Sequence, residues 1–192
     1  MVDLEAEIWQ YRSEGGSVDS ERFVFQEVTS LTAVAVGQPG RRTFYVVVGE
    51  EESWVRVWLE KEELLALSSA IGELVAIVSE SGLHPPLDMT ASAPEILFEP
   101  SSPPVADFKS NRLAVGYDQA RDRIGLFIYE PEANNDSPTL VCWITRIQAR
   151  TLGGKIDEVC AAGRPLCILC NGPIDPAGHV CPKSNGHGPR EL

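Results

Sequence analysis

The chain has 192 residues, of which 43% are hydrophobic and 23% are charged, a balance typical of a globular protein. Its 28 acidic residues outnumber its 16 basic ones, and the basic residues are scattered, which disfavours nucleic acid and anionic membranes as partners. The sequence contains no run of about 18 uncharged apolar residues and no basic, apolar start typical of a signal peptide, so we expect a cytoplasmic protein.

The first part of the chain changes from an acidic extension to a pattern of strands. Residues 1–21 are acidic, contain a Gly-Gly-Ser sequence and predict a flexible extension. Apolar residues then alternate at 23–25, 31–36, 43–48 and 54–59, with turn sequences between them. This period of two predicts the strands of an antiparallel meander.

A helix is predicted directly after these strands, over residues 61–79. Its apolar residues share one stripe at helical spacing, namely Leu64, Leu67, Ile71, Leu74, Val75 and Val78. Gly82 and two prolines end the helix. The following segment, 83–105, is rich in proline and predicts a connector with little regular structure.

After the connector the first pattern returns, which predicts an internal repeat. The sequence VRVWL at 55–59 recurs as LVCWI at 140–144, and AVG at 35–37, before the first hairpin turn, recurs at 114–116. The apolar positions of the first helix also recur 85 residues later, as Ala149, Leu152, Ile156, Val159 and Cys160. Thr145 and Gln148 have the spacing of a capping box at the start of this second helix.

We therefore predict a duplicated α+β domain over 22–163, with halves 22–82 and 106–163 joined by the connector. Each half is an antiparallel β-meander followed by one helix, and neither half alone covers its apolar surface, so the two are expected to pack together with pseudo-twofold symmetry. Chance similarity between two amphipathic β-α units is the alternative explanation.

The five cysteines fall into two groups. Cys142 and Cys160 occupy the positions of Val57 and Val75 in the repeat, where cysteine packs as a small buried apolar residue. The other three are crowded in the tail, 164–192, at spacings typical of metal ligands, so a disulfide framework is the weaker interpretation.

The tail predicts a structural Zn²⁺ site with four ligands: Cys167, Cys170, His179 and Cys181. Two thiolates separated by two residues form half of such a site, and a histidine and a cysteine two apart on an extended segment point the same way and close it. Three alternatives remain open, namely reduced surface thiols, a redox-active CxxC pair, and His187 as the ligand in place of His179.

No catalytic or cofactor-binding residues are predicted. The phosphate-binding, dinucleotide-binding, hydrolase and zinc-protease motifs do not occur, nor does the histidine-glutamate unit of zinc deaminases. His84, beside two prolines, is interpreted as a loop residue.

Two further groups of residues are candidates for a binding surface. Trp54, Trp58 and Trp143 are predicted on the strand faces opposite the helices, where they line a groove or a dimer interface or form a second apolar layer. Arg41 and Arg42 flank one hairpin turn, and Arg121 and Arg123 the equivalent one, so they are candidates for a symmetric anion site or for ordinary exposed turn residues.

Three segments carry a resemblance to a known family. VWLEKE at 57–62, AAGRP at 161–165 and the tail CxxCNGPxDPxGHxCP from 167 to 182 resemble the bacterial domain-of-unknown-function family 3090, over residues 21–187. Its members usually have proline after the first tail cysteine and glycine after the second, where this chain has Ile168 and Asn171, but the ligands are kept. The resemblance implies a bacterial protein of this architecture and supplies no activity.

From these observations we expect a non-catalytic interaction or adaptor module that binds a protein partner, with a homodimer as a further candidate. A small-ligand-binding protein or an enzyme, with a site in the groove between the halves, is the alternative.

Overall fold

A computed structural model describes residues 23–50, 52–88, 90, 91, 93, 102–131, 137–162, 167–170, 174 and 178–183. The predicted extension over 1–21 lies outside these residues. Within the described part of the chain, neither helix combines the length and the apolar character needed to cross a membrane.

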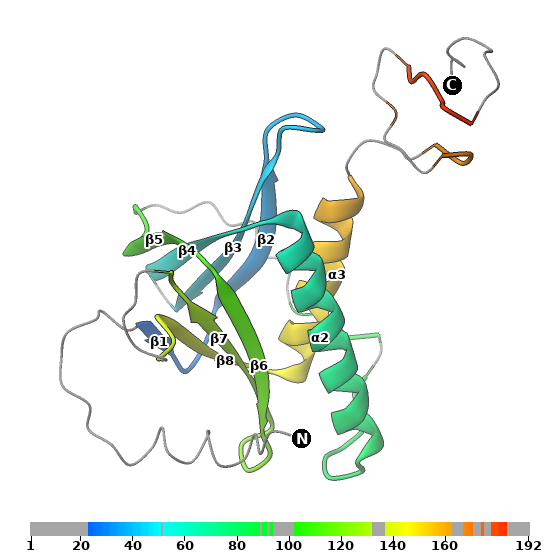
Figure 1. Cartoon of the computed structure of the whole chain (residues 1–192). Coiled ribbons are helices and arrows are strands. Elements are labelled where there is room, and N and C mark those ends of the chain that lie inside the picture. The colour runs from blue at the N-terminus through cyan, green and yellow to red at the C-terminus, as the bar shows by residue number, and fades with distance from the viewer. Residues whose placement is uncertain are drawn as a thin grey trace.

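The fold is α+β, with two four-stranded mixed sheets and two helices (Figure 1). The first sheet has the order β2-β3-β4-β5, formed by Ser30–Val36, Thr43–Glu50, Ser53–Leu59 and Ala106–Lys109. The second has the order β1-β8-β7-β6, formed by Phe23–Phe25, Leu140–Ile144, Arg123–Tyr129 and Arg112–Asp118. In each sheet three strands form an antiparallel meander, as predicted.

The fourth strand of each sheet comes from the other side of the connector and runs parallel. β5 pairs with β4, placing Phe108 beside Val57, and β1 pairs with β8, placing Phe25 beside Cys142. The prediction that residues 23–25 belong to the first, antiparallel meander is therefore wrong. Alternating apolar residues indicate a strand but carry no information about its partner, and a three-residue strand fits either sheet.

The two helices, α2 (Lys61–Glu80) and α3 (Arg146–Ala161), lie side by side along the sheets (Figure 1). Both begin at a capping box, formed by Glu60 with Glu63 and by the predicted pair Thr145 with Gln148. In α2 the predicted stripe faces the core, with Leu74 at its half-buried edge. Where the helices touch, Ser68 Oγ donates to Gly153 O at 3.2 Å and lies 2.9 Å from Asp157 Oδ1.

A continuous core joins both halves. α3 packs against β2 and α2 packs against β6, so each helix contacts the first meander strand of the other half. Cys142 and Cys160 are buried in this core, as the repeat predicted, and burial raises the pKa of Cys142 to about 12. At this position the sulfur is a protonated, apolar packing atom.

The predicted repeat aligns residues 35–37 with residues 114–116, but these two segments do not occupy equivalent positions in the structure. Gly37, with φ of 106°, lies at the β2–β3 turn, whereas Gly116 lies inside β6 opposite Gly125. The second hairpin turns two residues later, after Asp118. The shared AVG sequence therefore does not mark equivalent positions, because three small residues are compatible with either a strand end or its interior.

Gly125 provides room for the aromatic pair on its sheet. A Cβ atom added there would lie 2.8 Å from Trp143 Cζ3 and 2.9 Å from Phe127 Cε2. We expect Gly125→Ala to lower the free energy of unfolding by about 1–2 kcal/mol, because the packed rings must shift. Gly154→Ala, in open space on α3, is the control and is expected to raise it by about 0.5–1 kcal/mol. Urea unfolding measures both; equal effects would contradict this role of Gly125.

Candidate metal centre

The predicted ligands come from two short segments that follow α3. Cys167 begins a turn that includes Cys170, and His179 and Cys181 lie two residues apart on the second segment. Gly178, which precedes His179, has φ of 95°, a conformation that glycine adopts without steric cost. The four side chains meet although 8 residues separate Cys170 from His179.

The four side chains lie close enough together to hold one metal ion. One ligand atom from each of Cys167, Cys170, His179 and Cys181 lies within 4.8 Å of all the others. The Sγ atoms of Cys167 and Cys181 are 3.7 Å apart, close to the about 3.8 Å that two zinc-bound sulfurs have at tetrahedral angles. Cys170 Sγ and His179 Nε2 are 3.1 Å apart. The prediction that these residues come together is confirmed.

The surroundings favour negative charge on the first sulfur. Backbone N–H groups of Cys170 and Leu169 donate to Cys167 Sγ and lower the pKa of this thiol to about 6. Desolvation and the neighbouring sulfur atoms instead raise the pKa of Cys181. Crowded thiols resist losing all their protons together, and a bound cation removes this repulsion.

A family model described as "Protein of unknown function (DUF3090)" matches residues 23–181. The chain belongs to this family. No curated protein and no solved structure matches the chain. The match spans both sheets, both helices and all four clustered residues, so the family pattern includes the tail as well as the body.

The alternative ligand, His187, lies outside the described residues. His84 lies in the connector, where its Nε2 is 3.1 Å from Gln119 O. Within the described part of the chain, the clustered set therefore contains one histidine, His179.

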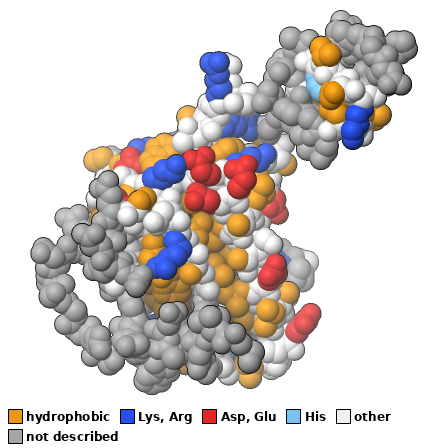
Figure 2. Space-filling model, in the orientation of Figure 1, with side chains coloured by type: hydrophobic (Ala, Val, Ile, Leu, Met, Phe, Trp, Pro, Cys, Tyr) orange, Lys and Arg blue, Asp and Glu red, His pale blue; other side chains and the backbone are white. Residues whose placement is uncertain are grey.

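The residues between the ligands expose apolar side chains. Ile168 is 95% exposed and Leu169 45% exposed inside the CxxC turn, and Val180, between His179 and Cys181, is 85% exposed. Figure 2 shows hydrophobic side chains beside the histidine on the surface of the tail. Their exposure on both segments of the Cys/His cluster is a feature that the sequence analysis did not single out.

The three tryptophans are engaged within their own sheets. Trp54 is buried, and its Nε1 donates to Ser102 O at 3.0 Å. Trp58 donates to Asp107 and packs edge-on against Tyr45, with ring centroids 5.0 Å apart. Trp143 packs against Phe127 in the other sheet. Each of the three tryptophan side chains therefore packs against other residues of the protein.

The arginines of the second hairpin turn are also engaged locally. Arg121 pairs with Asp118, and Arg123 donates to the backbone oxygens of Arg121 and Asp122. In the first turn, the backbone N–H of Arg41 donates to Gln38 O.

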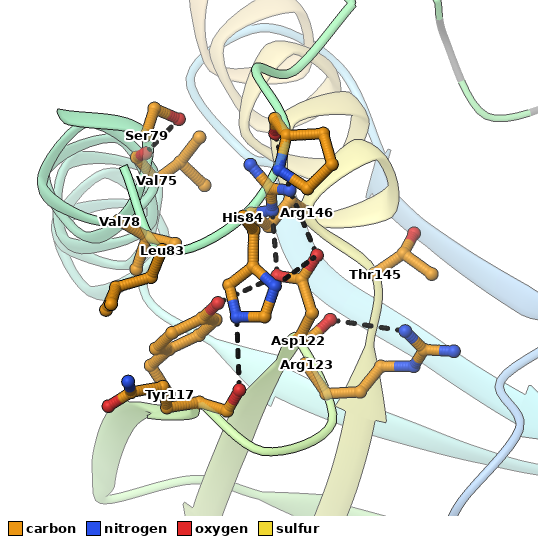
Figure 3. Close-up of polar contacts among 12 residues, drawn as sticks. Val75, Val78, Ser79, Leu83, His84, Tyr117, Asp122, Arg123, Thr145 and Arg146 are labelled. Atoms are coloured by element: carbon orange, nitrogen blue, oxygen red, sulfur yellow. Dashed lines mark hydrogen bonds and ion pairs between the residues drawn. The ribbon is translucent and has the colours of Figure 1, made fainter. Parts of the chain in front are cut away.

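A polar cluster that sequence reasoning missed joins the connector to the second half (Figure 3). Asp122 accepts from Tyr117 Oη at 2.8 Å and pairs with Arg146 Nε at 2.9 Å, and His84 Nδ1 lies 3.9 Å from the same carboxylate. Burial alone raises the pKa of Asp122, but hydrogen bonds from Arg146 and Tyr117 outweigh it and hold that pKa below its usual value. The sequence signal was an arginine at the first residue of a helix, where positive charge is unfavourable without a counter-ion.

Proposed function

We propose that this chain is a non-catalytic interaction module whose tail is held by a structural Zn²⁺ ion. The observation that carries the proposal is the cluster of Cys167, Cys170, His179 and Cys181, whose ligand atoms lie within 4.8 Å of one another. Three sulfurs and one imidazole nitrogen are the donor set of structural zinc sites, whereas calcium and magnesium prefer oxygen.

A complete set of four protein ligands favours structure over catalysis. A catalytic zinc ion keeps one coordination position for water or substrate, while structural sites fill all four with side chains. The metal would join the two ligand segments, 167–170 and 178–183, by bonding to two residues of each. Because the ligands must be reduced, the proposal includes a reducing compartment, the cytoplasm.

The surface of the tail supports a protein as the partner. Ile168, Leu169 and Val180 are exposed on the two ligand segments, so metal binding would hold the backbone that carries these apolar side chains in place. Exposed apolar side chains that are held rigidly lose little conformational entropy on binding, which favours a protein interface. A second copy of this chain is one partner that fits this chemistry.

We also propose that the two halves arose by duplication and form one domain, 22–163, with the tail as a separate unit. Support comes from the common order of a short strand, a meander and a helix, and from the reciprocal parallel pairing of β1 and β5. The helices meet at Ser68 and Gly153, which are 85 residues apart, the same offset as the predicted repeat.

The interaction surface is tested with the double variant Ile168→Ser/Val180→Ser. We expect it to keep about one zinc per chain and to lose a partner isolated with the native chain, or the dimer if the partner is a second copy. The matched control is Ile77→Ser, which removes an apolar side chain that is 64% exposed on α2 and is expected to keep both zinc and partner.

Partner binding unchanged in the double variant would contradict the proposal, as would loss of the partner in the Ile77→Ser control.

A thermal-shift screen of metabolites tests the alternative function, a small-ligand-binding protein or an enzyme. Saturable stabilisation by a metabolite would favour a ligand-binding protein or enzyme over the adaptor.

A further inference from the structure

Three thiol groups lie together at the candidate metal centre, and they come from two different segments of the tail. The Sγ atoms of Cys167 and Cys181 are 3.7 Å apart, and Cys170 Sγ lies within 4.8 Å of the other ligand atoms. None of the three residues forms a disulfide in the structure. A disulfide places its two sulfurs about 2.05 Å apart, so side-chain rotation is enough to join two of these thiols.

The tail thiols are more accessible than the other cysteines of the chain. Cys170 and Cys181 are half-buried, whereas Cys142 and Cys160 are buried in the core. Figure 1 shows the tail extending beyond the end of α3, away from the two sheets. Because the oxidation of a thiol depends on its exposure, a small polar oxidant reacts at the tail before it reacts in the core.

The contacts within the cluster favour a disulfide between the two segments. Cys170 Sγ lies 3.1 Å from His179 Nε2, while Cys167 Sγ lies against Cys181 Sγ of the other segment. A Cys167–Cys181 disulfide would link the two segments in place of the metal ion. A bond within the CxxC turn would leave them unlinked.

We propose that the tail is a redox-sensitive switch, in which a peroxide oxidises Cys167 and Cys181 to a disulfide and the Zn²⁺ ion is released. This inference rests on the structural Zn²⁺ site of the proposed function. The thiolate of Cys181 attacks one peroxide oxygen, which breaks the O–O bond and gives a sulfenic acid and a hydroxide ion. Cys167 Sγ then attacks the Cys181 sulfur, forms the S–S bond and expels a second hydroxide ion. The two thiolates lose two electrons, which reduce one peroxide.

The metal ion is released because oxidation removes two of its four ligands. Thiolate sulfur is the metal ligand, and both sulfurs of the new disulfide have lost that charge. Cys170 and His179 remain, and these two ligands do not make a closed tetrahedral Zn²⁺ site. Loss of zinc and formation of the disulfide are therefore expected to occur together.

Oxidation would also change the apolar surface of the tail. Leu169 precedes Cys170 in the sequence, and Val180 follows His179. Both ligands lose the metal on oxidation, so the backbone beside these apolar side chains is no longer held. The surface proposed to bind a protein would then depend on the redox state, and a dithiol reductant with Zn²⁺ would restore it.

The test treats the full-length, zinc-loaded chain with hydrogen peroxide in the presence of a chromogenic zinc chelator. We expect release of about one zinc ion per chain, in proportion to the disulfide formed, and less than about a tenth of this without peroxide. Dithiothreitol followed by Zn²⁺ is expected to return the zinc content to about one ion per chain.

Mass spectrometry identifies the paired cysteines. Cleavage on the N-terminal side of Asp157 and Asp175 separates Cys181 from the CxxC turn, so the peptide linked to Cys181 can be fragmented to find its partner. We expect this partner to be Cys167.

Two variants separate the switch from general oxidation. Cys160→Ala is the matched control, since it removes a core cysteine outside the cluster, and we expect it to release zinc and form the disulfide as the native chain does. Cys170→Ser keeps both sulfurs of the proposed disulfide. We expect it to form the Cys167–Cys181 disulfide although it holds no zinc.

Zinc that stays bound after oxidation, or that leaves without a Cys167–Cys181 disulfide, would overturn the switch but not the metal site. A disulfide between Cys167 and Cys170 would also overturn the switch. Absence of zinc from the untreated chain would instead overturn the proposed metal site, and the switch with it.

Discussion

Replacement of Cys167 or Cys181 by serine is expected to reduce the zinc content from about one ion per chain to less than about a tenth. Each change removes one of the four ligands, and the remaining three cannot complete a closed tetrahedral site. Metal analysis of the purified variants by mass spectrometry gives the answer directly.

The control for these variants is Cys160→Ala, which removes a cysteine that is buried in the core and is not one of the four clustered residues. It is expected to keep its zinc and to lose a little stability through the smaller side chain. Zinc retained by both tail variants, or lost from Cys160→Ala as well, would contradict the assignment of ligands.

Replacement of Asp122 by asparagine is expected to lower the free energy of unfolding by about 2–3 kcal/mol. The change leaves the buried guanidinium of Arg146 without its counter-ion, and the partial exposure of Asp122 places the effect below the about 3–5 kcal/mol of a fully buried pair. Asparagine tolerates the left-handed backbone at this position, so the variant isolates the charge. Urea unfolding at neutral pH is the measurement.

The same carboxylate makes stability depend on pH. Because the pKa of Asp122 is lowered in the folded state, its contribution is complete above the ordinary aspartate range and is lost as pH falls through the lowered value. Asp122→Asn should therefore reduce the dependence of stability on pH in acid. If Asp122→Asn instead changes the free energy of unfolding by less than about 0.5 kcal/mol at neutral pH, the Asp122–Arg146 pair contributes no more than a surface ion pair does.

Local features of the fold could be predicted because neighbouring residues determine them. The apolar stripe from Leu64 to Val78 and the Thr145–Gln148 capping box depend on spacings of three and four residues, and both are present in the structure. The metal cluster could be predicted for a similar reason, since a CxxC turn and an HxC segment each orient their own ligands.

The remaining features depend on contacts between distant segments, which local patterns do not specify. Nothing in the sequence of Phe23–Phe25 distinguishes β8 from β2 as a neighbour, since both partners are apolar strands. Asp122 and Arg146 meet only because the β6–β7 turn lies against the start of α3. The pairing of Asp122 with Arg146 could therefore not be predicted from the sequence.

The most direct test of the central claim, that the tail of this chain is a structural zinc site, is the metal content of the native protein purified without chelator. We predict about one zinc ion per chain, released only when the tail unfolds or its thiols are oxidised. Less than about a tenth of an equivalent of zinc in such a preparation would contradict the account.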